Sequence, residues 1–185
     1  MRWTSFLAGF VAAIVLALVI ALGVIFSGAY DVAATDRHNP VVAWAFDTTY
    51  ENSVSRQASA IAAPEMTPAM VEAGAREYKA MCAHCHGGIG ESRAGWAGGI
   101  RPKPPALASA AKHLSASEVF WLVKHGVKMS GMPAFGPTHD DQAIWNIAAF
   151  VKAMPGMSAQ RYAAYGAEGQ DGGHGHEHGG GGHGE

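Results

Sequence analysis

Apolar residues follow one another without a charge near the N-terminus of the chain. Residues Phe6 to Phe26 are almost all Ala, Val, Leu, Ile and Phe, and these 21 residues are uncharged. As a helix they would measure about 32 Å, which matches the hydrocarbon core of a bilayer. Arg2 precedes the stretch and Asp31 follows it. The positive-inside rule then keeps the N-terminus in the cytoplasm and exports the remainder, so residues 1–29 are predicted to be a membrane anchor.

A cleaved signal peptide is the alternative interpretation of this apolar stretch. Residues 27–29 and 32–34 both end in small residues, which is typical of cleavage sites. However, the apolar region of a signal peptide usually covers only about 7–15 residues. The greater length here favours an uncleaved anchor.

Residues 30–66 form an acidic spacer, with five Asp or Glu against two Lys or Arg. Asn39 and Pro40 are typical of a helix start, where Asn caps the first turn and Pro occupies it. An apolar side chain then recurs at every fourth position: Val42, Phe46, Tyr50 and Val54. The pattern predicts a short amphipathic helix. It would lie on the membrane surface, lie against a partner subunit, or pack on the chain's own globular domain.

Three helical patterns predict an all-α globular domain over residues 67–160. The helices are expected over residues 68–81, 115–125 and 138–155. Ser115 and Glu118 have the spacing of a capping box, which supports the start of the second helix. No alternating pattern predicts a strand. The Gly- and Pro-rich loop over residues 87–113 is long for so small a domain, which suggests that it wraps around a bound group.

Both cysteines of the chain lie in one pentapeptide that has the sequence Cys-x-x-Cys-His. At the end of a helix, Cys82, Cys85 and His86 would share one face, because residues i, i+3 and i+4 do so. Two thiols on that face can bond to the two vinyl groups of one haem, and the imidazole can bind its iron. The motif therefore predicts covalent attachment of a single haem c.

Three other interpretations of the motif fit the sequence less well. A structural zinc site needs a fourth ligand and usually a second cysteine pair, which the chain lacks. A thioredoxin-like dithiol needs a βαβ setting, which the helical pattern does not provide. A chance match is the third, but the predicted export and the long loop both favour haem.

The sixth ligand of the iron is expected further along the chain. Carrier haems usually have His and Met ligands, or two His. Met132 stands between Gly131 and Pro133, which restrict the backbone to a tight turn that presents one side chain. Met129 is the alternative thioether. The remaining alternatives are three histidines that would give a bis-His site: His113, His125 and His139.

On these residues the chain resembles a class I, mitochondrial-type c-type cytochrome, of the bacterial membrane-anchored monohaem kind. Gly74 and Tyr78 match the family's pair on the first helix, where the terminal helix crosses. The crossing face of that terminal helix is matched by Ile147, Phe150 and Val151. The resemblance covers residues 68–157. It implies a small cytochrome c fold wrapped around one haem, with one N-terminal transmembrane helix.

The resemblance also assigns roles in the haem-binding loops. Pro105 and Leu107 match a Pro-x-Leu element in which the Pro carbonyl accepts a hydrogen bond from the proximal His, and the Leu packs on the haem. Pro102 and Pro104 are close by in the sequence, and Pro105 is preferred because it has the Pro-x-Leu spacing to Leu107. Met132 matches the axial methionine of the family. Trp121 is expected either to line the haem edge or to be an ordinary core residue.

The predicted function is electron transfer within a respiratory or dehydrogenase chain, without enzymatic activity. The chain would be a single-pass inner-membrane protein with its haem domain in the periplasm. Its partners would be membrane redox proteins: an oxidase, a reductase or a dehydrogenase. A formal net charge of −2 argues against nucleic acid as a partner. Lys124 and Lys128, close in sequence to Met132, are candidates for docking an acidic partner.

The C-terminal residues 161–185 are rich in Gly and His and are expected to be disordered. Four of their histidines have spacings that can bind copper, nickel or zinc: His174, His176, His178 and His183. A haem sensor or metal-handling protein that uses this tail is therefore one alternative function. A cytochrome c subunit of a haem enzyme complex is the other.

Overall fold

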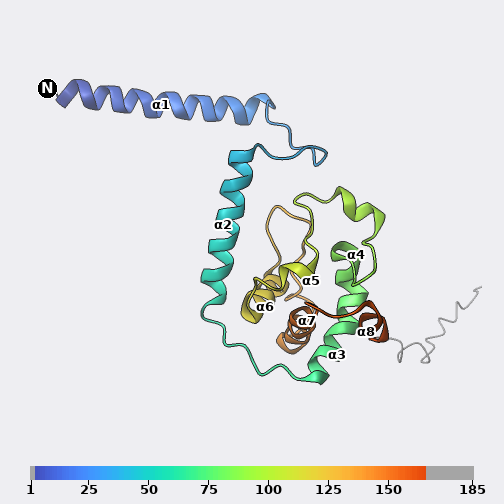
Figure 1. The fold of residues 1–185 in the computed structure, drawn as a ribbon. Helices are drawn as coiled ribbons and strands as arrows, with labels where there is room; N and C mark the ends of the chain where they lie inside the picture. Colours follow the sequence, from blue (N-terminus) through green and yellow to red (C-terminus); the bar gives the residue numbers. More distant parts are fainter. Residues whose placement is uncertain (1–2, 166–185) are drawn as a thin grey trace, which may run out of the picture. The chain divides into compact units, whose positions relative to one another are not determined.

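Helices account for the regular secondary structure of residues 3–165, the part of the chain that this computed structural model describes (Figure 1). In chain order they are α1 (Trp3–Ser27), α2 (Pro40–Ala58), α3 (Pro68–Glu77), the π-helical turn η1 (Tyr78–Cys82), α4 (Ala83–His86), the 3₁₀ turn η2 (Gly95–Gly99), α5 (Leu107–Ala110), α6 (Ala116–His125), α7 (Asp141–Ala153) and α8 (Ala159–Ala164). These residues contain no strand, so the predicted all-α class is confirmed. The chain divides into two units between Asp36 and Arg37.

Helix α1 makes up most of the first unit. It is long and apolar enough to cross a membrane, and none of its residues is buried within the protein. A signal sequence near the N-terminus has the same properties. The structure is therefore consistent with both interpretations of the apolar stretch.

Helix α2 belongs to the second unit, and it begins as the sequence predicts. Pro40 is its first residue, and the Asn39 side chain accepts a hydrogen bond from the backbone N–H of Val41 at 2.9 Å. Near its C-terminal end, Val54 and Ala58 are buried, each with 3% of its surface exposed. This end packs against α6. Of the interpretations of the spacer, packing on the chain's own domain therefore holds for the C-terminal half of α2.

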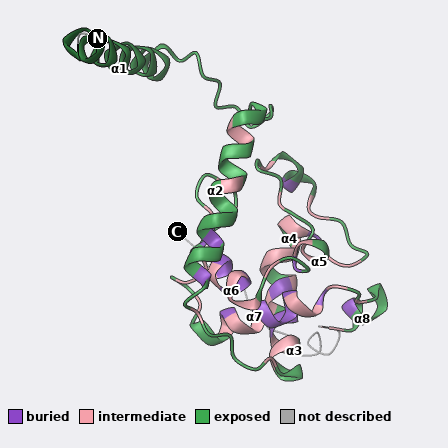
Figure 2. Ribbon diagram, turned by 60° about the vertical axis from the view of Figure 1, so that its left-hand side comes forward, coloured by how far each residue is buried: buried purple, intermediate pink, exposed green. Residues whose placement is uncertain are grey.

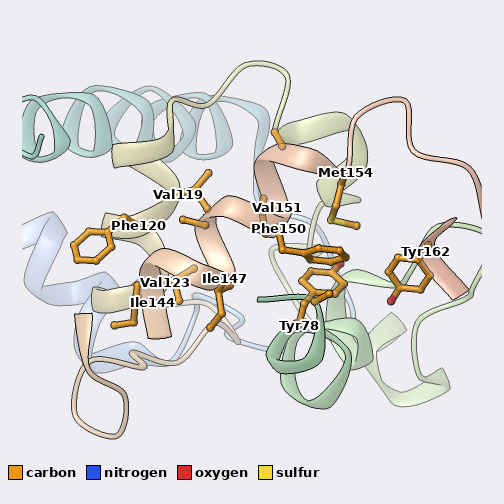
Figure 3. Close-up of a cluster of buried hydrophobic side chains, with 13 residues drawn as sticks. Tyr78, Val119, Phe120, Val123, Ile144, Ile147, Phe150, Val151, Met154 and Tyr162 are labelled. Atoms are coloured by element: carbon orange, nitrogen blue, oxygen red, sulfur yellow. The ribbon is translucent and has the colours of Figure 1, made fainter. Parts of the chain in front are cut away.

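The frame of the second unit is the crossing of α3 and α7. A Cβ atom at Gly74 would lie 1.8 Å from the backbone oxygen of Asn146, so only glycine permits this approach. The face of α7 that lies in the crossing carries Ile147, Phe150 and Val151, all of which are buried (Figure 3). The close crossing that the resemblance implied is present.

An aromatic cluster joins the end of α3 to this frame (Figure 3). Tyr78 is fully buried, with its ring centroid 5.2 Å from that of Phe150 and 6.5 Å from that of Tyr162. Its hydroxyl donates a hydrogen bond to the carbonyl of Gly87 at 2.6 Å. The cluster therefore fixes the polypeptide on both sides of the Cys-x-x-Cys-His motif, because Tyr78 and Gly87 flank it.

The packed chain extends further than the sequence indicated, and the boundary expected at residue 160 is wrong. Helix α8 crosses that boundary, and its Tyr162 is fully buried. The Lys79 ammonium lies 4.7 Å from the centre of the Tyr162 ring and donates hydrogen bonds to the carbonyls of Ala163 and Tyr165. A six-residue helix with one buried ring leaves almost no periodic signal in the sequence. The tail histidines at positions 174, 176, 178 and 183 lie outside the described residues.

We predict that Gly74→Ala destabilises the protein, because the added methyl group overlaps the backbone of α7. Overpacking of this kind costs about 1–3 kcal/mol of unfolding free energy. Gly98→Ala is the matched control, since nothing lies within 4 Å of the Cβ it would add. It should change the unfolding free energy by less than about 0.5 kcal/mol. Chemical denaturation of both variants measures the difference, and equal stability would refute the close crossing.

Candidate functional site

The attachment motif lies where α3 ends. Cys82 is the last residue of the π-helical turn η1, and Cys85 and His86 close the short helix α4. Both thiols are free and only partly buried. Burial raises the pKa of Cys82 to about 12, because removal from water disfavours the thiolate. Two unpaired thiols and an imidazole within five residues are the groups that a covalently bound haem requires, and they fit it.

His86 is held in one orientation by the proline-rich loop. Its Nδ1 lies 2.8 Å from the carbonyl oxygen of Pro105, to which it donates a hydrogen bond. The Nε2 atom then carries the lone pair that can bind a metal. Burial lowers the pKa of His86, which favours the neutral imidazole that metal ligation needs. The hydrogen bond that the resemblance implied is thus present in the structure.

The neighbouring prolines have different roles, which the spacing alone did not show. The carbonyl of Pro104 accepts a hydrogen bond from the Arg93 guanidinium at 2.9 Å. The backbone N–H of Ala94 bonds to the carbonyl of His84 at 2.9 Å, which fastens the start of the same loop to the motif. Arg93 and Ala94 therefore place the Pro105 carbonyl opposite His86. Sequence reasoning missed Arg93, because one arginine in a long loop gives no motif.

Met132 sits in a loop that is built on the C-terminal end of α6. The N–H of Phe135 bonds to the carbonyl of Val123 at 3.1 Å, and that of Val127 bonds to the Met132 carbonyl at 3.2 Å. The hydroxyl of Ser130 accepts from the Met132 N–H at 3.1 Å. Met132 is partly buried and packs against the core cluster, as do Leu107 and Cys82. An attachment thiol, the Leu of the Pro-x-Leu element and the candidate axial ligand therefore all pack against the same core cluster.

Gly126 makes this loop possible. Its φ is +65°, and a Cβ atom there would lie 2.7–2.8 Å from the backbone of residues 132–134. The sequence indicated this glycine only as the stop of a helix. That this glycine also allows two backbone segments to approach closely cannot be seen in the neighbouring sequence.

The alternative axial ligands are placed less favourably. Met129 is 81% exposed and has a φ of 58°, so its side chain extends into solvent. His113 and His125 are exposed, and the His139 Nδ1 is 2.8 Å from the Thr138 hydroxyl oxygen. Within residues 3–165, no three His, Cys, Asp or Glu side chains gather as a metal site would require. Of the two methionines, only Met132 packs against the core cluster.

Trp121 and Lys124 lie on α6 beside this loop. Trp121 is half-buried and outside the core cluster, with its ring centroid 5.1 Å from that of His125. The Lys124 ammonium forms an ion pair with Asp141 at 2.6 Å. Of the two lysines that the sequence offered for docking, Lys124 is therefore partly neutralised by its neighbour, whereas Lys128 is exposed.

Residues 69–151 match the model of the family described as "Cytochrome C oxidase, cbb3-type, subunit III". The match covers nearly all of α3, the attachment motif, the proline-rich loop, the loop of Met132 and most of α7. Residues 69–151 form a class I c-type cytochrome domain. The cytochrome domain binds haem c covalently, and haem-based electron transfer is its chemistry. A comparison with curated proteins finds no match.

Gly126→Ala should destabilise the methionine loop of the cytochrome domain. Gly156→Ala is the control, because Gly156 also has a positive φ, of 80°, but nothing lies within 4 Å of its added Cβ. Both variants lose the conformational freedom of glycine, and only Gly126→Ala adds a backbone clash. Its unfolding free energy should fall by about 1–3 kcal/mol more than that of Gly156→Ala. Denaturant titration of the haem-loaded proteins gives both values, and equal losses would contradict the close approach.

Proposed function

We propose that the chain is a membrane-anchored, periplasmic electron-transfer cytochrome with one haem c, whose iron is bound by His86 and Met132. One observation carries the proposal: both ligand-bearing segments are held by the backbone of the cytochrome domain. The Pro105 carbonyl orients His86 at 2.8 Å, and hydrogen bonds from α6 support the loop of Met132. Ligands that are fixed before the metal binds favour a constant coordination in both oxidation states.

The haem supplies one-electron chemistry between the ferric and ferrous states. The residues of the chain attach, orient and shield it. Cys82 and Cys85 would provide the two thioether links, and Leu107 would provide apolar contact to the haem. If His86 and Met132 both bind the iron, the haem would have no free site for a substrate or for oxygen. This arrangement favours a carrier over a haem enzyme.

A thioether ligand also raises the reduction potential relative to a second imidazole. Such a carrier suits the high-potential part of a respiratory chain, where its partners would be an oxidase, a reductase or a dehydrogenase. The matched family is described as a subunit of an oxidase. That description favours a second candidate, in which the chain works as a permanent subunit of an oxidase complex. The electron-transfer role of the domain is the same in both cases.

Anchoring by α1 completes the proposal. Its 25 residues are uncharged and mostly apolar, and none is buried within the protein. The proposal takes α1 as an uncleaved single span of the inner membrane. Positive-inside orientation then places the cytochrome domain on the periplasmic side, where c-type haem attachment and membrane redox partners are expected.

The axial ligand can be tested by absorption spectroscopy of the purified, haem-loaded protein. Met–iron coordination gives the ferric protein a weak absorption band at the red end of the visible spectrum. Met132→Ala should abolish this band, because of the two candidate thioethers Met132 is the one that packs against the core cluster. Met129→Ala is the matched control and should retain it, since the Met129 side chain extends into solvent. A band that survives in Met132→Ala and disappears in Met129→Ala would refute the assignment.

A further inference from the structure

The first two turns of α2 are apolar on every side. Residues 40–46, which we call the α2 tip, contain seven consecutive apolar residues. Successive residues of a helix are about 100° apart, so seven of them surround the axis nearly twice. Val41, Trp44 and Phe46 are 69%, 67% and 48% exposed. The residues at positions 42 and 43 are half-buried, and the other five are exposed. The α2 tip is thus a largely exposed apolar ring, whereas the fourfold spacing predicted a one-sided stripe.

The other end of the same helix is fixed to the cytochrome domain. Val54 and Ala58 are each 3% exposed where α2 packs on α6 (Figure 2). Beyond the helix, the Ser117 hydroxyl donates a hydrogen bond to the Ile61 carbonyl at 2.8 Å. The α2 tip is therefore the free end of a continuous helix whose base belongs to the cytochrome domain.

A ring of apolar side chains requires an environment that can cover all its sides. A flat protein surface would cover one side of the helix and leave the other in water. Helices that are apolar all round are found inside large proteins or in membranes. Lipid surrounds an inserted helix from every direction, so a membrane fits the α2 tip better than a flat partner surface does.

The chain itself brings a membrane within reach. Helix α1 ends at Ser27 and α2 begins at Pro40, so only residues 28–39 separate them. These 12 residues span at most about 43 Å when fully extended. If α1 crosses the bilayer as proposed above, the α2 tip is the first helix after the span. Position 44 is a tryptophan, and tryptophan is enriched at the boundary between lipid and water.

The start of α2 is also suited to leave water. Pro40 has no backbone N–H, and the Asn39 side chain accepts the N–H of Val41 at 2.9 Å. Two of the donors that a helix start normally exposes are thereby absent or satisfied. The tip contains no Lys or Arg, and the acidic Asp47 follows it directly. Insertion would therefore depend on apolar burial and would not require anionic lipids.

We propose that the α2 tip inserts into the interfacial layer of the membrane that α1 spans. The inference rests on the anchoring part of the proposed function. The cytochrome domain is then attached at two points, through the linker to α1 and through its own helix α2. Two attachments restrict how the domain can turn, and so they limit which of its surfaces faces a membrane-embedded redox partner.

Photocrosslinking in native membranes tests this directly. The full chain would carry p-benzoylphenylalanine in place of Trp44, with Asn52→p-benzoylphenylalanine as the matched control on the exposed, polar part of the same helix. After irradiation, mass spectrometry should find phospholipid adducts in the variant with the crosslinker at position 44. It should find none in the variant with the crosslinker at position 52. An unchanged haem spectrum in both variants shows that the cytochrome domain is folded.

Other outcomes would overturn the inference. A crosslink from position 44 to another protein, or to a second copy of this chain, shows that the ring is a protein interface. Extraction of the membranes with alkaline carbonate separates this failure from a failure of the proposed anchoring. A chain that stays in the membrane but gives no lipid adduct at position 44 refutes the α2 insertion alone. A chain that is released refutes the anchor and the insertion together.

Discussion

The close crossing of α3 and α7 at Gly74 is the constraint on which the cytochrome domain depends. The absence of a side chain there lets the two helix backbones touch, and Asn146 lies directly over the glycine. The crossing places Tyr78 against Phe150 and so fixes the direction in which the chain leaves α3. The attachment motif follows within four residues of Tyr78. The contact between α3 and α7 at Gly74 therefore determines the position of His86, although His86 itself lies on α4.

The two candidate axial ligands are held in place by independent contacts. His86 depends on a proline-rich loop that Arg93 holds through the Pro104 carbonyl. Met132 depends on Gly126, which allows its loop to fold back on α6. A domain of about 90 residues buries a small core, and such domains usually need a covalent or metal-based staple. The thioether links and axial bonds of one haem would supply it, and they would join the segment of residues 82–86 to the distant loop of Met132.

Much of this arrangement could be predicted from the sequence because its signals are local. The helix start at Asn39 and Pro40, the capping box at Ser115 and the spacing of Cys82, Cys85 and His86 each require only a few neighbouring residues. The resemblance to a known family supplied Gly74, Pro105 and Leu107, since a lone Gly or Pro carries no signal of its own. The axial role of Met132 stays a prediction, although its partial burial agrees with it.

What the sequence did not indicate arises from contacts between distant segments. The pairing of Lys124 with Asp141 and of Lys79 with α8 joins residues that are 17 and more than 80 positions apart. The turns η2 and α5 are too short to show a period, so their segment looked like an irregular loop. The α2 tip differs from the stripe that the fourfold spacing predicts, because its seven consecutive apolar residues surround the helix axis.

The central claim is that this chain is a carrier whose iron has a protein ligand on both sides. Exposure of the reduced, full-length protein to carbon monoxide tests that claim most directly. If His86 and Met132 both bind the iron, the ferrous absorption spectrum should remain unchanged on mixing, because neither axial position is open. Rapid formation of a carbon monoxide complex by the unmodified protein would contradict the claim and favour a haem enzyme or sensor.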